Sequence, residues 1–225
     1  MRSDLLLLPR LTLAGAVLLF AVGCASTGSG PDTKAGKASE PAKSHPMPTL
    51  SRDGDLGFSV TEVVRIDSDV RRDYQQALGL LHAGQLEAGI DLLESVVARA
   101  PDVTNPYIDL GVAYAELDQL DKAEENLKSA LSLAPNHPAA LNEMGIVYRR
   151  TGRFADARES YEKALTIYPG FHYALLNLGV LCDLYLDDLT CALNNYERYA
   201  DIVTDDDEVG IWIADIKNRL EAGQE

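Results

Sequence analysis

The sequence is poor in the residues from which catalytic and metal sites are built. Its 225 residues include only 4 histidines and 3 cysteines. The histidines form no His-x-x-x-His pair and join no Cys/His cluster with zinc spacing. The sequence also contains no glycine-rich phosphate loop, no Gly-x-Ser-x-Gly motif and no Cys-x-x-Cys pair. We therefore expect a protein without enzymatic activity, cofactor or metal.

Basic residues are also scarce. The chain has 20 Lys and Arg against 35 Asp and Glu, which gives a formal net charge of −15 at pH 7. A surface of this charge repels nucleic acid and anionic lipid headgroups. The composition therefore excludes nucleic acid as a partner and favours a protein, in particular a basic one.

Long hydrophobic runs are missing except near the N-terminus. An uncharged apolar run, residues 11–22, follows Arg2 and Arg10 and stops just before Cys24. This pattern predicts a secretory signal peptide over 1–23, because the run is too short to span a membrane permanently.

The four residues Ala21, Val22, Gly23 and Cys24 resemble the lipobox of bacterial lipoproteins. The resemblance implies cleavage between Gly23 and Cys24, with Cys24 carrying diacylglycerol and acyl chains such as palmitate at the mature N-terminus. It also implies a lipid-anchored protein of the bacterial cell envelope, and Ala25 favours the outer membrane facing the periplasm. The alternatives are an ordinary cleaved signal with a chance cysteine and an uncleaved anchor.

Two segments of different composition follow. Residues 24–55 consist largely of Ser, Thr, Gly, Pro, Ala and Lys, which provide too little apolar surface to offset the entropy of ordering. We expect a disordered tether there, with a root-mean-square span of about 30 Å. Residues 56–67 are more apolar, and we expect an N-terminal extended segment that covers the first repeat; the alternative is that a partner displaces it, so that it acts as an internal competitor.

The rest of the chain has a 34-residue period. Pro101, Pro135 and Pro169 are 34 residues apart. The same spacing recurs in further columns, which are Leu110, Met144 and Leu178; Gly111, Gly145 and Gly179; Tyr114 and Tyr148; Ala123 and Ala157; Leu127 and Tyr161; and Ala130 and Ala164. The period and phrases such as "LNEMGIVYRRTGRFADARESYEKALTIYP" resemble tetratricopeptide repeats (TPRs).

The resemblance implies an all-α fold, a right-handed α-solenoid of about four helix-turn-helix repeats with a C-terminal capping helix. The predicted parts are a degenerate first repeat over 68–103, repeats over 104–137, 138–171 and 172–206, the last with one inserted residue in its turn, and a capping helix over 207–221. Trp212 on that helix is interpreted as packing against the last repeat, with a binding anchor as the alternative.

By resemblance to the family, a concave groove is lined by residues of the first helix of each repeat. The candidates are Tyr74, Leu78, His82, Ile108, Val112, Asn142, Ile146, Arg149, Leu176 and Val180. This set is largely apolar, which suits an extended hydrophobic peptide or an amphipathic helix and disfavours the carboxylate clamp of chaperone-binding TPR proteins. The alternative for any one of them is a place in the core between repeats.

Cys182 and Cys191 flank the turn of the fourth repeat. An oxidising periplasm would allow a disulfide between them; two separately buried thiols are the alternative.

Two classes of function fit these features. The first is a non-enzymatic scaffold, resembling pilotins, that binds a peptide or helix of an envelope partner during assembly of an outer-membrane or trans-envelope machine of the secretin, pilus or TonB type. The second is an adaptor that recruits or regulates peptidoglycan hydrolases or proteases in the periplasm. A solenoid that forms homo-oligomers is a third.

Overall fold

The computed structural model describes residues 49–53, 57–61 and 65–223, which fall in two separate units, one before and one after residue 64. The predicted signal peptide, its cleavage site, Cys24 and most of the predicted tether lie outside the described residues.

The first unit contains a two-stranded antiparallel sheet, in which β1 (Thr49–Asp53) pairs with β2 (Gly57–Thr61). The register joins Thr49 to Thr61 and Asp53 to Gly57. β1 lies in the stretch predicted to be disordered, so that prediction is wrong for residues 49–53. A strand satisfies its backbone hydrogen bonds on a partner strand, and composition alone gives no sign that the two segments pair.

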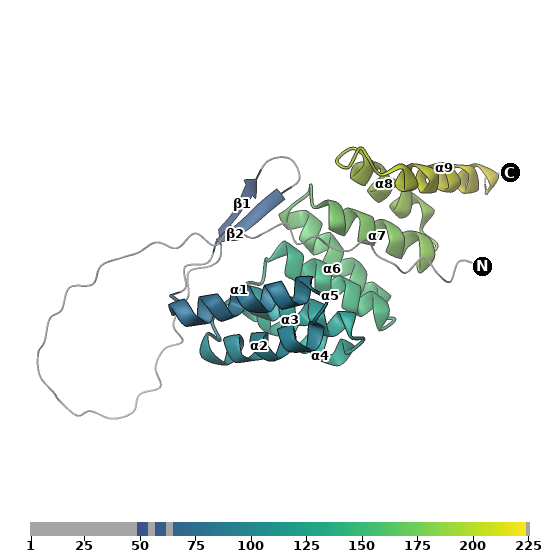
Figure 1. Cartoon of the computed structure of the whole chain (residues 1–225). Helices are drawn as coiled ribbons and strands as arrows, with labels where there is room; N and C mark the ends of the chain where they lie inside the picture. Colours follow the sequence, from purple (N-terminus) through teal and green to yellow (C-terminus); the bar gives the residue numbers. More distant parts are fainter. Residues whose placement is uncertain (1–48, 54–56, 62–64, 224–225) are drawn as a thin grey trace, which may run out of the picture. The chain divides into compact units, whose positions relative to one another are not determined.

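The second unit is a stack of helices. Figure 1 shows them following one another in chain order. The described residues form α1 (Ser68–His82), α2 (Leu86–Arg99), α3 (Thr104–Glu116), α4 (Leu120–Leu133), α5 (Pro138–Arg150), α6 (Phe154–Ile167), α7 (His172–Leu184), α8 (Leu189–Ala200) and α9 (Asp207–Ala222). Each odd-numbered helix up to α7 pairs with the next one, neighbouring pairs pack on each other, and α9 packs on α8. The predicted all-α solenoid is confirmed.

Small residues allow the two helices of each pair to approach closely. A Cβ at Gly179 on α7 would lie 2.5 Å from the ring of Tyr196 on α8, and a Cβ at Gly145 on α5 would collide with the ring of Tyr161 on α6. In the second pair the side chain of Leu127 fills the same place over Gly111. Each glycine of this column therefore makes room for a large side chain of the following helix.

The turns within the pairs need left-handed backbone. Gly84 and Gly152 have φ of 73° and 76°, and Asp118 and Asp187 have φ of 60° and 51°. Glycine adopts this conformation without steric cost, and aspartate tolerates it better than most residues. These positions let each pair reverse direction within a short turn.

The last helix covers the end of the stack. Val209 and Ile216 are buried, and the half-buried ring of Trp212 lies 5.4 Å from that of Tyr196. This contact supports a packing role for Trp212. None of the helices described in the structure is both long enough and apolar enough to cross a membrane.

Candidate functional site

The candidate site is the face formed by α1, α3, α5 and α7, which we call the first-helix surface. Of the residues predicted to line a groove there, only His82 is exposed. Four are half-buried, namely Leu78, Val112, Leu176 and Val180. The other five are buried, namely Tyr74, Ile108, Asn142, Ile146 and Arg149.

The prediction that these five line an open groove is therefore wrong. The cause is the offset between successive first helices: a residue on one helix lies against the residue 35 positions later, one place beyond its equivalent in the next repeat. Tyr74 and Asp109 contact each other in this way, as do Asn142 and Asn177. The following repeat thus covers positions that would face solvent on an isolated hairpin.

The contacts between first helices are polar, which the apolar interpretation of the groove did not foresee. The hydroxyl of Tyr74 donates a 2.6 Å hydrogen bond to Oδ2 of Asp109. The amide of Asn177 donates to Oδ1 of Asn142 at 3.0 Å, and within α5 the amide of Asn142 donates to Oε1 of the adjacent Glu143 at 3.0 Å. The sequence does contain a signal for these contacts: polar residues recur every 34 positions, at 109, 143 and 177. We call this set of polar residues and their partners Tyr74 and Asn142 the polar ladder.

Burial changes the acidity of two carboxyl groups in this ladder. It raises the pKa of Asp109 to about 6, although the hydrogen bond from Tyr74 acts in the opposite direction. It also raises the pKa of Glu143 to about 7, with an opposing contribution from the Asn142 hydrogen bond and a further rise from the charge of Glu116.

Arg149 is the one predicted groove residue that carries a buried charge. Its side chain is 6% exposed, and its Nη1 donates to the hydroxyl of Tyr185 at 3.5 Å. Its guanidinium lies 5.7 Å from the centre of the Tyr185 ring. The next residue, Arg150, points elsewhere and donates to the carbonyl oxygen of Ala115 and to Asp118.

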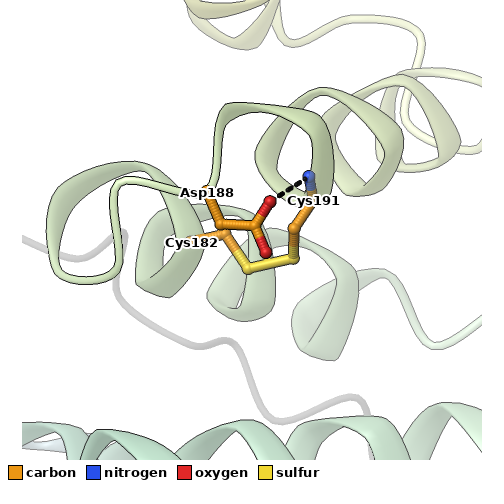
Figure 2. A group of neighbouring side chains, drawn as sticks. All are labelled: Cys182, Asp188 and Cys191. Atoms are coloured by element: carbon orange, nitrogen blue, oxygen red, sulfur yellow. Dashed lines mark hydrogen bonds between the residues drawn. A yellow bond between two sulfur atoms is a disulfide. The ribbon is translucent and has the colours of Figure 1, made fainter.

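Cys182 and Cys191 form a disulfide, with their Cα atoms 5.8 Å apart, as Figure 2 shows. Between them Asp188 begins α8, and its Oδ1 accepts a 3.0 Å hydrogen bond from the backbone N–H of Cys191. Arg158 donates to Asp188 Oδ2 at 2.6 Å and approaches Sγ of Cys182 at 3.4 Å. The ligand atoms of the three residues in Figure 2 lie within 4.8 Å of one another. A disulfide sulfur is not the thiolate that binds metals, so in this form the cluster is a covalent link.

The described residues also form a pocket of about 450 Å³ between α4, α5 and α6. Its walls combine the apolar side chains Leu141 and Met144 with charged ones such as Lys128, Asp156 and Lys163. None of the predicted groove residues lines it. It lies between the second helices of two successive repeats, α4 and α6, and the intervening first helix α5. The apolar periodicity of single helices does not predict such a pocket.

Residues 102–170 match the family model of the tetratricopeptide repeat. No curated protein matches the sequence. Among solved structures, MamA from Desulfovibrio magneticus RS-1 is similar with a TM-score of 0.62 at 18% identity, over 70% of this chain and 88% of that one. Pseudomonas aeruginosa PilF gives 0.62 at 21% identity, over 68% and 69% of the two chains. A thermophilic TPR protein from Thermus thermophilus gives 0.59 at 23% identity, over 66% and 81%.

At these identities the structures establish the fold, and the family match establishes the repeats in the middle of the chain. The helices from α1 to α9 form an all-α solenoid similar to those of TPR protein structures, and residues 102–170 within it match the tetratricopeptide repeat model.

Proposed function

We propose that the protein is a lipid-anchored scaffold of the bacterial cell envelope. In this proposal, it binds a peptide or helix of an envelope partner while an outer-membrane or trans-envelope machine of the secretin, pilus or TonB type is assembled. The anchor would be the lipid on Cys24, and the tether would keep the solenoid near the outer membrane, on its periplasmic side.

The observation that carries the binding role is the apolar part of the first-helix surface. Leu78, Val112, Leu176 and Val180 remain half-buried, although the next repeat covers their neighbours. Leu184, at the end of α7, is 57% exposed. Apolar side chains on successive first helices offer a partner segment several anchoring points along the stack.

Site-specific crosslinking tests the proposal. A photoreactive phenylalanine analogue at Val180 on the first-helix surface is compared with one at Glu125, an exposed residue of α4. We expect the first to capture a component of an envelope assembly machine and the second to capture little. Capture of peptidoglycan hydrolases or proteases would instead indicate the adaptor function, and capture of a second copy of this chain would indicate a homo-oligomer.

Lipid labelling tests the proposed lipid anchor and localisation separately. The wild-type chain is expected to incorporate radiolabelled palmitate and to fractionate with the outer membrane, whereas Cys24→Ala would lose the label. Unchanged export processing in the presence of globomycin would contradict a lipoprotein signal and leave the binding role of the solenoid intact.

A further inference from the structure

Arg149 is a buried cation without a counter-ion. It lies in the last turn of α5 with 6% of its surface exposed. Its Nε has no hydrogen-bond partner, and no carboxylate oxygen of the described residues lies within 4.0 Å of its guanidinium. An uncompensated buried charge is strongly destabilising, so a group that satisfies it on binding would gain a correspondingly large interaction.

Most other arginines in this part of the fold pair with an acidic residue. Arg150, Arg153 and Arg158 of the third repeat and Arg219 of α9 form ion pairs with carboxylates. Arg198, the arginine of the fourth repeat, has no ion pair with the described residues either, but it is only half-buried and its Nη2 donates to the carbonyl oxygen of Pro169 at 3.1 Å. Acidic residues are abundant in this chain, which carries 35 of them. Arg149 is therefore a buried guanidinium that has no carboxylate partner among the described residues, in a chain rich in acidic residues.

A second unpaired polar group lies beside it. Tyr161 is completely buried, and its hydroxyl makes no well-aligned hydrogen bond with the described residues. Its ring reaches over Gly145 from α6 to α5, the helix that carries Arg149. Arg149 lies close enough for its charge and a weak hydrogen bond to the Tyr161 oxygen to lower the pKa of this phenol, against a larger rise caused by burial. In this contact the Tyr161 oxygen accepts, so Nε–H of Arg149 and O–H of Tyr161 remain two donors that an acceptor group could satisfy.

Tyr185 is a partly exposed residue in contact with Arg149. It follows the last residue of α7, contacts Arg149 through its hydroxyl and packs against Phe154 with the two rings tilted and their centres 5.0 Å apart. It is itself 37% exposed, next to the exposed Leu184. Rotation of this one surface side chain would open a route to the guanidinium, bordered by an apolar residue that a bound peptide can contact.

We infer that Arg149 and Tyr161, beneath Tyr185, form a binding site for one carboxylate of the partner, either its C-terminal carboxylate or the side chain of a Glu or Asp. The inference rests on the proposed function and names the chemistry of the bound segment. A guanidinium and a carboxylate match in shape and form strong charge-assisted hydrogen bonds. The site differs from the carboxylate clamp considered for the groove, since the positions of that clamp are occupied by residues such as Leu78 and Val112.

The charge of the site favours a carboxylate over a phosphate. It contains a single unpaired cation, and the negative charge of Glu143 already acts on Tyr161. A phosphate dianion would leave net negative charge in a buried place, where such charge is costly. A carboxylate monoanion would be neutralised by Arg149 alone when Glu143, whose pKa burial raises to about 7, holds its proton.

The test uses the full-length chain in detergent, labelled with ¹⁵N in its arginines. The Nε–H signal of Arg149 is assigned from its absence in Arg149→Met and Arg149→Lys. The probes are 4-fluorobenzoate, the neutral 4-fluorobenzamide and phenyl phosphate. We expect fluorobenzoate to shift this signal saturably and fluorobenzamide to leave it in place; no shift, an equal shift with the amide, or tighter binding of phenyl phosphate would overturn the inference.

Variants add a second readout. Arg149→Met should lower the affinity for fluorobenzoate about tenfold or more, since it removes a charge-assisted hydrogen bond. Arg150→Met, at the neighbouring exposed and paired arginine, should bind like the wild type. Tyr185→Ala should speed association by opening the route. Should Arg149→Met fail to fold, the titration of the wild type still decides.

Peptide probes separate the two sources of the carboxylate. Acetyl-Ala-Leu-Ala-Leu-Ala with a free C-terminus is compared with its C-terminal amide and with acetyl-Ala-Leu-Glu-Leu-Ala amide. Preference for the first indicates a C-terminal carboxylate, preference for the last indicates a side chain, and equal binding of all three contradicts the inference. If the partner that is crosslinked at Val180 binds Arg149→Met and the wild type with equal affinity, the carboxylate site is refuted and the proposed function stands. If fluorobenzoate binds but no partner is crosslinked, the proposed function is refuted and the carboxylate site stands.

Discussion

Tyr74 and Asp109 are joined by a 2.6 Å hydrogen bond across the boundary between two repeats, 35 residues apart in the sequence. Asn142 and Asn177 repeat the same offset at a later boundary, between α5 and α7. Buried polar groups are costly unless paired, so a shift of one hairpin against the next would leave these groups without partners. The polar pairs therefore fix the register between first helices, while apolar packing supplies most of the stability.

Tyr74→Phe should destabilise the protein by about 1.5–3 kcal/mol, because the phenylalanine leaves a buried carboxyl group without its donor. The free energy of unfolding at pH 7 is measured by urea titration, followed by circular dichroism. Tyr107→Phe is the matched control, since Tyr107 is a half-buried tyrosine of the neighbouring α3, and it should change stability much less. Equal effects of the two substitutions would argue against a specific role for the Tyr74 hydroxyl.

Asp109→Asn should stabilise the protein at pH 7.5, by about 3 kcal/mol, and this gain should disappear toward pH 4. Burial raises the pKa of Asp109 from 3.8 to about 6, so the folded state holds this proton more tightly than the unfolded state. The stability associated with the group is complete below pH 3.8 and is lost as the pH rises through 6. Glu143→Gln should behave in the same way over a window that extends to about pH 7.

The measurement is the difference in unfolding free energy between variant and wild type at each pH. The pH dependence of wild-type stability does not report the two carboxyl groups alone, because His137 also contributes to it. Burial lowers the pKa of His137 to about 4, so protonation of this residue destabilises the folded state in acid. A difference that stays constant from pH 4 to pH 7.5 would show that neither carboxyl group is perturbed in the folded state.

The helices and their pairing could be predicted from sequence because the 34-residue columns record contacts within each hairpin. Gly111, Gly145 and Gly179 recur since each lies under a large side chain of the following helix. Such contacts connect positions that are close in sequence and repeat with the period, so they leave a visible pattern.

The burial of the first-helix surface could not be predicted in the same way. Whether Ile108 or Ile146 faces solvent depends on how the next hairpin tilts over it, and that offset is not encoded in the pattern of one helix. The absence of a carboxylate partner for Arg149 is still harder to predict from the sequence, because it depends on which acidic side chains reach each arginine in the folded protein. The β1–β2 pairing lacks any helical or repeating signal.

Gly179→Ala should destabilise the protein by about 1–3 kcal/mol through overpacking, even though alanine favours helix. A Cβ there would lie 2.5 Å from the ring of Tyr196, which is 1% exposed and has no room to withdraw. Gly210→Ala on α9 is the matched control: nothing lies within 4 Å of its Cβ position, so this substitution should stabilise by about 0.5–1 kcal/mol. Thermal unfolding followed by circular dichroism compares the two, and stabilisation by both would show that Tyr196 can move aside.

Loss of the Cys182–Cys191 disulfide should lower the free energy of unfolding by about 2–3 kcal/mol in the loop-entropy model, given its sequence separation of 9. The link holds the end of α7 to the first turn of α8 across a turn that includes Asp187 in left-handed conformation. Without it the unfolded chain regains the freedom of that loop, while Asp188 still begins α8 and still pairs with Arg158. The double variant Cys182→Ala, Cys191→Ala is compared with the wild type by urea unfolding, with and without dithiothreitol. Dithiothreitol should destabilise the wild type and leave the double variant unchanged, because Cys24 has no place in this crosslink; equal sensitivity of the two proteins would mean that the reductant acts elsewhere in the chain.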